Sequence, residues 1–309
     1  MLECQLVSLS YDGLRDAVTG LNFTVAAGSI FALVGPNGAG KTSTLRMLAT
    51  LQEPSSGRIL VDGIDAAKDP EAVRRRVGYL PDHFALYDQM TPLEYLDFFG
   101  RCYDIDETTR RRRAEQLLAE LDLESKQKSA IVSLSRGMRQ RLGVAKTLMH
   151  DPKVLLLDEP ASALDPGARL KLKEVLLRLK SRGLAILISS HILPDLAGLA
   201  DSVGIMEGGR LIRCGAVATM AGTTRTTWSI DVRANVDKAL RVFAEFGPRL
   251  SAPRPTTPGR FEVEIEGGPD VVAELVEALV LRGARVAEVA PRESALEAMY
   301  RQSAATEVA

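Results

Sequence analysis

A glycine-rich segment between a short apolar run and a helix-compatible stretch narrows the possible folds of this chain more than any other pattern. It reads Gly35-Pro-Asn-Gly-Ala-Gly-Lys-Thr42 and fits G-x-x-x-x-G-K-[ST] at every fixed position. The apolar residues 28–35 predict a strand, and residues 41–50 predict a helix. Backbone N–H groups of such a loop close around phosphates, while the helix N-terminus and the lysine supply positive charge. The segment therefore predicts a nucleotide phosphate site in an α/β fold.

Each residue of this segment, and the residue after it, is a candidate for binding nucleotide. The Lys41 ammonium is expected to reach the outer phosphates, and the Thr42 hydroxyl to hold Mg²⁺. The candidates are Gly35, Pro36, Asn37, Gly38, Ala39, Gly40, Lys41, Thr42 and Ser43. A glycine-rich turn with an exposed lysine is the alternative, but it does not explain the predicted strand and helix on either side.

Two acidic residues end a second apolar run. Asp158 and Glu159 follow the aliphatic residues 154–157, which are typical of a strand buried on both faces of a parallel sheet. Ligands of open α/β sheets bind at the carboxyl ends of such strands. We expect Asp158 to bind Mg²⁺ directly or through water, and Glu159 to orient or deprotonate the attacking water. Alternatively, the two carboxylates only cap a strand end before Pro160.

The remaining patterns of the N-terminal two thirds predict repeated βαβ units with an antiparallel addition. Aliphatic runs at 153–158 and 184–189 flank a predicted helix at 167–181. Residues 91–150 lack strand signals and read as helices. We expect a domain over residues 1–220 with a helical insertion at about 83–150. The alternating runs that predict antiparallel strands are 5–9, 21–25 and 58–61.

From about Thr223 the pattern changes to two similar passes of strand and then helix. A proline-rich loop is expected at 252–259 between them, and a third strand and a last helix are expected to follow. This order predicts a small α+β domain over residues 223–309, with ferredoxin-like topology as one candidate.

Composition argues against several other classes of protein. The 39 basic and 40 acidic residues nearly cancel, so no global field draws the chain to nucleic acid. Apolar runs stop well short of the roughly 18 to 20 residues that cross a membrane, and no secretory signal is visible. The 3 cysteines lack CxxC spacing, which indicates reduced thiols. We expect a cytoplasmic chain without a nucleic-acid partner.

With these motifs and the segment described next, the chain resembles the nucleotide-binding subunits of ATP-binding cassette (ABC) transporters. Leu134-Ser-Arg-Gly-Met138 is similar to the family signature Leu-Ser-Gly-Gly-Gln, and it departs from it at Arg136 and Met138. Ser135 and Gly137 are retained; in the family, their hydroxyl and backbone N–H reach the γ-phosphate of ATP on the partner subunit. Taken alone, Ser135 would more simply be the N-cap of an arginine-rich helix.

The resemblance assigns roles to one further segment and three further residues. The segment 162–165 (Ser-Ala-Leu-Asp) matches the dimer-contact loop, and His191 matches the switch histidine that contacts the γ-phosphate and holds the catalytic water. Tyr11 stands where the family places an aromatic ring against adenine, although a tyrosine in an alternating strand is often a core residue. Asp82 replaces the usual glutamine that touches Mg²⁺; its carboxylate is still an oxygen ligand, with a simple turn residue as the alternative.

The resemblance implies a P-loop NTPase of the ABC ATPase type that binds ATP and Mg²⁺ and works as a homodimer. It also implies a separate transmembrane permease and a location on the inner face of the membrane. Exporters of the second ABC family are the most similar, because of the altered signature, Gly78-Tyr-Leu-Pro followed by Asp82, and a C-terminal domain ending in residues 294–300. The alternatives are a soluble ABC ATPase not coupled to transport and an unrelated P-loop kinase or GTPase.

Overall fold

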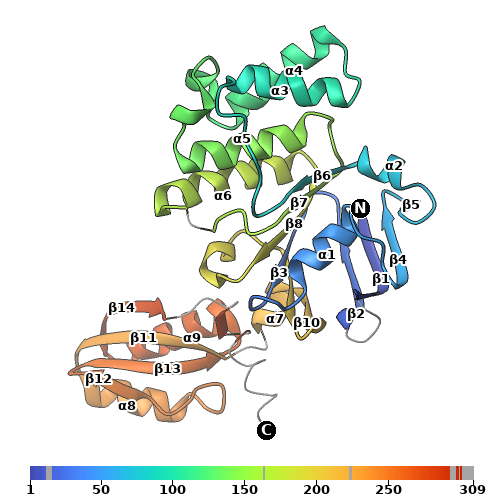
Figure 1. Ribbon diagram of the computed structural model, residues 1–309. Coiled ribbons are helices and arrows are strands. Elements are labelled where there is room, and N and C mark those ends of the chain that lie inside the picture. Colours follow the sequence, from blue (N-terminus) through green and yellow to red (C-terminus); the bar gives the residue numbers. More distant parts are fainter. Residues whose placement is uncertain (12–15, 163, 223–224, 293–296, 299, 301–309) are drawn as a thin grey trace. The chain divides into compact units, whose positions relative to one another are not determined.

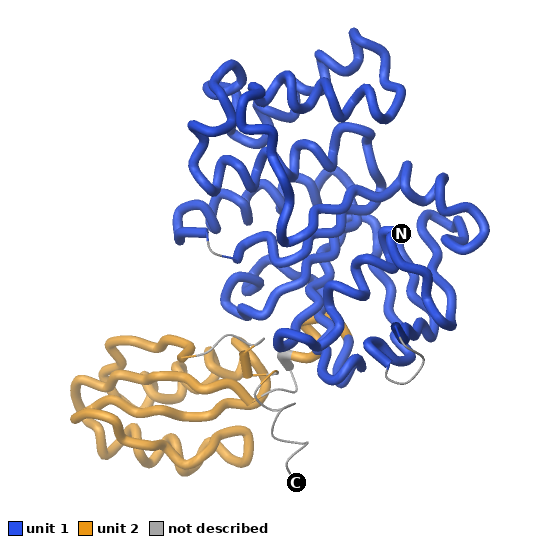
Figure 2. The backbone as a smooth tube through the Cα atoms, viewed as in Figure 1, with its two compact units in different colours: residues 1–214 blue, residues 215–309 orange. Residues whose placement is uncertain are grey.

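The computed structural model describes residues 1–11, 16–162, 164–222, 225–292, 297–298 and 300 (Figure 1). The chain divides into two compact units, Met1–Cys214 and Gly215–Ala309 (Figure 2). We call them the first unit and the C-terminal unit. Each has a hydrophobic core of its own.

A six-stranded sheet in the order β10-β9-β3-β8-β7-β6 forms the centre of the first unit. Strand β3 pairs in parallel with β8 and β9, and β7 pairs in parallel with β8 and β6. All residues of β3, β7 and β8 are buried, as expected of strands covered on both faces. The three strands predicted from the aliphatic runs are therefore confirmed. The strands are β3 (Ile30–Val34), β6 (Val77–Leu80), β7 (Val154–Leu157), β8 (Ala185–Ser190), β9 (Ser202–Glu207) and β10 (Arg210–Ala216).

A second sheet of the first unit has the order β2-β1-β4-β5. Its strands are β1 (Leu2–Ser10), β2 (Asp16–Val25), β4 (Ser56–Val61) and β5 (Ile64–Asp65). Strand β1 pairs antiparallel with β2 and β4, and buried residues recur along all three strands where they meet the core. The antiparallel strands predicted at this side of the domain are confirmed.

Helices fill the chain between β6 and β7, and Figure 1 shows α3, α4 and α5 together at one end of the first unit. Polar residues begin each of them: Thr91 forms a capping box with Glu94, Asp106 caps α4, and Ser135 caps α5. The helices of the first unit are α1 (Lys41–Leu48), α2 (Pro70–Arg74), α3 (Pro92–Cys102), α4 (Glu107–Glu120), η1 (Glu124–Lys126), η2 (Ile131–Ser133), α5 (Arg136–Leu148), α6 (Pro166–Ser181) and η3 (Leu193–Leu196). None of the helices that the structure describes is long and apolar enough to span a membrane.

The C-terminal unit contains a four-stranded sheet in the order β12-β13-β11-β14, with antiparallel neighbours throughout. With α8 after β11 and α9 after β13, this is the βαββαβ arrangement of a ferredoxin-like fold. Buried apolar residues of β11, β13, α8 and α9 form its core. Its elements are α7 (Val217–Gly222), β11 (Arg225–Ala234), α8 (Val236–Glu245), β12 (Arg254–Thr257), β13 (Arg260–Glu266), α9 (Gly268–Leu281) and β14 (Arg285–Pro291).

The expected proline-rich loop at 252–259 was wrong over its middle part, because residues 254–257 form the edge strand β12. An edge strand tolerates Pro255 because one of its sides has no ladder partner that needs an N–H donor. The last helix predicted from the sequence, and most of the segment 294–300, lie outside the described residues.

Candidate active site

The glycine-rich loop joins the end of β3 to the start of α1. Gly38 and Gly40 have positive φ values of 82° and 101°, which glycine adopts without strain. At Gly35 a Cβ atom would lie 2.1 Å from the Met206 carbonyl oxygen, so a side chain does not fit there. No side chain caps α1. Its first backbone N–H groups are therefore open to an anion, as the sequence predicts.

The Lys41 ammonium lies over this loop and is buried. Its Nζ donates hydrogen bonds to the carbonyl oxygens of Gly35, at 2.7 Å, and Pro36, at 3.1 Å. It also lies 3.4 Å from Glu159 Oε1. The end of β7 and the start of α1, far apart in the sequence, thus bring a cation and a carboxylate together at the mouth of the loop.

His191 is the third member of this cluster. Its Nδ1 lies 2.8 Å from Glu159 Oε2, and its backbone N–H donates to the same oxygen at 3.3 Å. Glu159 has a φ of +48°, in the left-handed region that non-glycine residues seldom occupy. Lys41 and His191 thus both contact the Glu159 carboxylate, each through a different oxygen.

Asp158 lies at the end of β7 and is almost completely buried. Its Oδ1 accepts a hydrogen bond of 2.6 Å from Ser189 Oγ, whereas its Oδ2 is buried without a hydrogen-bond partner among the described residues. Burial of Tyr79 raises its pKa to about 12, and the nearby negative charge of Asp158 contributes to this rise. A buried carboxylate oxygen without a partner is an unusual feature that a hard cation would satisfy.

The residues present therefore fit a magnesium ion, although not as an all-protein cage. Among the described residues, no group of three or more His, Cys, Asp or Glu side chains could hold a metal. Mg²⁺ commonly takes one or two protein oxygens and completes its shell with phosphates and water. Asp158 Oδ2 and the exposed Thr42 hydroxyl are the matching protein ligands.

Ser189 is a site residue that the sequence analysis did not find. Besides its bond to Asp158, its Oγ accepts the backbone N–H of Glu159 at 2.9 Å. One buried hydroxyl therefore positions both acidic residues. The signal was the same one that revealed Asp158, namely a polar residue near the end of a buried aliphatic run.

Asp82 follows β6 and contacts the segment 162–165. Ser162 Oγ donates to its Oδ1 at 3.2 Å, and His83 Nδ1 lies 3.7 Å from its Oδ2. Ala163 of that segment lies outside the described residues. These contacts connect Asp82 to the predicted dimer-contact loop, while its part in binding Mg²⁺ stays a prediction.

Tyr11 has an exposed ring, with 59% of its surface accessible, so it is not a core residue. Its hydroxyl lies 3.0 Å from Ser43 Oγ on α1, close in sequence to the phosphate loop. An exposed aromatic ring tied to this helix is available for stacking on a base. The adenine contact itself remains a prediction.

Ser135 and Gly137 lie at the start of α5. Ser135 Oγ accepts the Met138 N–H at 3.3 Å, so the N-cap suggested by the sequence alone is present. A Cβ atom on Gly137 would lie 2.7 Å from the Ala168 Cβ of α6, so glycine permits close packing of these two helices. The Ser135 contact lies within α5, and the Gly137 contact joins α5 to α6. The contact of either residue with ATP on a partner subunit stays a prediction.

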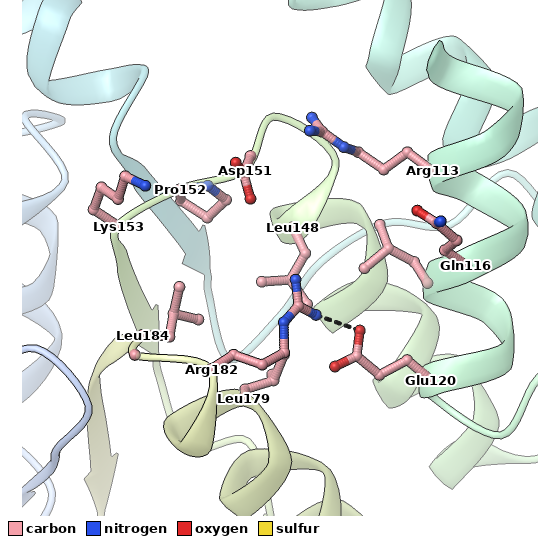
Figure 3. Close-up of a pocket in the computed structure, with 12 residues that line it drawn as sticks. Arg113, Gln116, Glu120, Leu148, Asp151, Pro152, Lys153, Leu179, Arg182 and Leu184 are labelled. Atoms are coloured by element: carbon pink, nitrogen blue, oxygen red, sulfur yellow. Dashed lines mark hydrogen bonds and ion pairs between the residues drawn. The ribbon is translucent and has the colours of Figure 1, made fainter. Parts of the chain in front are cut away.

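A cavity of about 390 Å³ lies elsewhere in the first unit, where the ends of α4, α5 and α6 meet (Figure 3). Charged residues line it, and Arg182 pairs there with Glu120. None of the predicted nucleotide-binding residues lines this cavity. The candidate active site is therefore the loop mouth, not the cavity.

With the geometry established, comparison with known proteins identifies the family. Residues 18–162 match the family described as ABC transporter. The ABC transporter ATP-binding protein NatA of Bacillus subtilis is 37% identical over 211 residues, which cover 68% of this chain and 86% of NatA. The chain belongs to the ABC transporter ATP-binding proteins. An ABC ATPase of this kind binds and hydrolyses ATP, and the alternative of an unrelated P-loop kinase or GTPase is excluded.

Other relatives of this ABC ATPase extend over different lengths of the chain. The uncharacterised ABC transporter ATP-binding protein YxlF of Bacillus subtilis is 34% identical over 97% of this chain and 98% of its own length. The Nod factor export ATP-binding protein I of Ralstonia nicotianae is 39% identical over 67% of this chain and 66% of its own length. The similarity to YxlF therefore includes the C-terminal unit.

Solved structures confirm the predicted fold class. An ATP-binding subunit of an ABC transporter superposes with a TM-score of 0.64 at 33% identity, covering 71% of this chain and 91% of that one. CbiO1 of Clostridium perfringens, part of the ABC transporter complex CbiONQ, superposes with a TM-score of 0.65 at 27% identity, covering 70% of this chain and 88% of that one.

Proposed function

We propose that this ABC ATPase hydrolyses Mg²⁺-bound ATP as half of a head-to-tail homodimer, and that hydrolysis drives export through a separate transmembrane permease. One observation carries the proposal: Lys41, Glu159 and His191 converge at the mouth of the phosphate loop. This arrangement provides a cation for the phosphates, a carboxylate for water, and a histidine that holds the carboxylate in place.

In the proposed mechanism, the loop N–H groups and the Lys41 ammonium bind the β- and γ-phosphates. The Glu159 carboxylate orients the attacking water and accepts its proton. Because His191 Nδ1 is engaged with Glu159, Nε2 is the ring nitrogen that would contact the γ-phosphate. Ser189 Oγ accepts a hydrogen bond from the backbone N–H of Glu159, which holds the Glu159 carboxylate next to the phosphate loop.

Magnesium would be held by the Thr42 hydroxyl and Asp158 Oδ2, with Asp82 as a third candidate ligand. The ion would neutralise phosphate charge. The unpartnered, buried Asp158 Oδ2 supports this assignment. Tyr11, tied to Ser43 on α1, would stack on the adenine.

The second half of the site would come from the partner subunit. Ser135 and Gly137 at the N-terminus of α5 would contact the γ-phosphate bound to the other protomer, where the positive end of the helix favours an anion. The contact between Asp82 and Ser162 would connect the dimer interface to the helical insertion at about 83–150. We propose that this insertion, within a domain over residues 1–220, contacts the permease.

Export through a membrane partner draws support from the relatives. One is named a Nod factor export protein, and CbiO1 is part of a transporter complex. We accordingly place the protein at the cytoplasmic face of the cell membrane, without a nucleic-acid partner. The alternative is a soluble ABC ATPase not coupled to transport. Co-purification of the full chain with an apolar integral membrane protein distinguishes the two.

The test of hydrolysis is Glu159→Gln. The variant should bind ATP normally but release phosphate about 100- to 1,000-fold more slowly, because the amide cannot accept a proton from water. It should also accumulate as an ATP-bound dimer, measured by light scattering.

Glu71→Gln, a change at an exposed glutamate of α2, is the matched control and should turn over like the parent protein. Adding Ser135→Arg to Glu159→Gln should leave ATP binding intact and prevent the dimer. Normal turnover by Glu159→Gln would remove Glu159 from its proposed role, and tight ATP-dependent dimers of the double variant would refute the contact of Ser135 with the partner.

A further inference from the structure

Arg169 on α6 connects two segments that the mechanism uses separately. Its Nε donates a hydrogen bond of 2.9 Å to the backbone carbonyl of Leu164, in the dimer-contact loop. Its Nη1 donates a bond of 3.1 Å to Asp195 Oδ1, on the short helix η3 that follows His191. A single guanidinium thus bonds to the loop expected to meet the partner subunit and to the segment that carries the switch histidine.

The Asp195 end of this connection depends on Arg169. The Asp195 side chain is only 10% exposed, and its Oδ2 is buried without a hydrogen-bond partner among the described residues. A buried carboxylate is costly unless a cation pairs with it, so the packing of η3 on α6 depends on this ion pair. One turn further along α6, Lys173 Nζ bonds to the Ala197 carbonyl and fixes the far end of η3.

The other end of the path reaches the reacting groups. His191 lies just before η3, and its Nδ1 contacts Glu159 Oε2 at 2.8 Å. A shift of η3 would therefore move the histidine and, through it, the carboxylate. A misplacement of about 1 Å at such groups can lower the catalytic rate about 100-fold.

The region around Arg169 contains a small cavity. This cavity, of about 30 Å³, lies between α6, the residues just before the dimer-contact loop, and η3. Pro160 and Ala161 line it on the loop side, and Leu196 and Leu199 on the η3 side. This void lies beside the Arg169–Asp195 contact, since both residues also line it.

We propose that Arg169 is a positioning residue that transmits closure of the dimer-contact loop to His191 and Glu159 through Asp195. The inference rests on the proposed function, because it assumes that the segment 162–165 meets a partner subunit. It adds a regulatory connection: hydrolysis in one site becomes sensitive to dimer closure through the Leu164–Arg169–Asp195 path.

The test is steady-state ATP hydrolysis by the full chain bearing Arg169→Gln. Its kcat should fall about tenfold, a size typical of lost coupling between sites, while its KM for ATP stays within about twofold. The Hill coefficient for ATP should fall toward that of independent sites. Lys171→Gln, a change at an exposed lysine of the same helix, is the matched control and should behave like the parent.

Two further variants separate positioning from simple stability. Arg169→Lys keeps a cation opposite Asp195 but lacks the planar fork that reaches Leu164 as well. It should retain the thermal unfolding temperature of the parent and still lose cooperativity. The double variant Arg169→Gln with Asp195→Asn should be no slower than the worse single variant, since both break one path.

Unchanged kcat and Hill coefficient in Arg169→Gln would overturn the inference, as would a loss of kcat that only tracks the fraction of unfolded protein. Additive losses in the double variant would also refute the path. These failures leave the proposed function standing. A parent protein that hydrolyses no ATP, alone or with membrane fractions, would instead refute the proposed function and this inference together.

Discussion

In the parallel sheet of the first unit, polar side chains collect where buried strands end, whereas in the C-terminal sheet charged side chains run along one face of the strands. Strands β7 and β8 are buried throughout, and Asp158 and Ser189 lie at their carboxyl ends. Strand β13 instead alternates buried apolar residues with partly exposed charged ones.

The two arrangements differ in whether the charges satisfy one another. In the C-terminal sheet, Asp231 pairs with Arg233 at 3.1 Å and with Arg260 at 3.3 Å, and Arg260 also pairs with Glu288 at 3.0 Å. In the first unit, Asp158 keeps a buried oxygen without a hydrogen-bond partner among the described residues. Charges that pair within the fold need no ligand, whereas an unpaired buried charge indicates a place where a ligand completes the structure.

The sharpest way to break this comparison is to neutralise one aspartate in each sheet. Asp158→Asn should reduce ATP hydrolysis by about 100-fold or more through loss of a cation ligand, with an unfolding temperature equal to or above that of the parent. Asp231→Asn should leave kcat unchanged and lower the free energy of unfolding by about 1–3 kcal/mol, because Arg233 loses its carboxylate partner and Arg260 keeps only Glu288. Kinetics and calorimetry on both variants check this, and an unstable but active Asp158→Asn would reverse the assignment.

A pH titration tests His150, a buried group near the start of β6, at the end of the parallel sheet opposite to Asp158. His150 stacks on Tyr103, and its Nε2 lies 3.0 Å from the Val77 carbonyl at the start of β6. Burial is the main reason why the pKa of His150 falls to about 4; Arg113 lowers it further and Asp151 raises it. Below pH 6.5 the unfolded chain therefore binds a proton that the native chain does not.

The free energy of unfolding should consequently decrease by about 1–3 kcal/mol as pH falls from 6.5 to 4. His150→Gln should flatten this part of the profile, even if it lowers stability at neutral pH. His83→Gln, a change at an exposed histidine, is the control and should keep the slope. An unchanged slope in His150→Gln would assign the acid sensitivity to other groups.

The smallest effect is expected from an exposed pair on the C-terminal sheet. Arg292 Nε lies 3.3 Å from Glu262 Oε1, and both side chains are substantially accessible. Arg292→Gln should change the free energy of unfolding by less than about 0.5 kcal/mol, since solvent screens such pairs. A loss as large as that of Asp231→Asn would show that exposure does not distinguish the two sets of charges.

The parts of the fold predicted from the sequence are those with continuous apolar runs, alternating runs or fixed motifs. Strands β3, β7 and β8 have such runs, whereas β9 was not predicted because Gly204 interrupts it. That glycine has a packing reason, since a Cβ atom there would lie 2.9 Å from both Phe31 and Leu211. Strand β12 was mistaken for a loop because its proline reads as a breaker unless the edge position is known.

In the candidate site, too, some residues could be predicted from local sequence patterns and others could not. Lys41, Asp158 and Glu159 stand in motifs whose spacing alone indicates their chemistry. Ser189 and Arg169 matter through partners 20 or more residues away or through a backbone carbonyl, as with Asp158, Asp195 and Leu164. Sequence patterns of single elements do not encode such contacts, which appear only once β7, β8 and α6 are packed together.

The left-handed backbone at Glu159 has a consequence for the stability of the end of β7. A side chain held at φ +48° carries conformational strain on the order of 1–3 kcal/mol, which glycine would relieve. Selection for stability alone would therefore drive this position toward glycine. In the proposed mechanism, the glutamate at this position keeps a carboxylate for the attacking water at a cost in conformational stability.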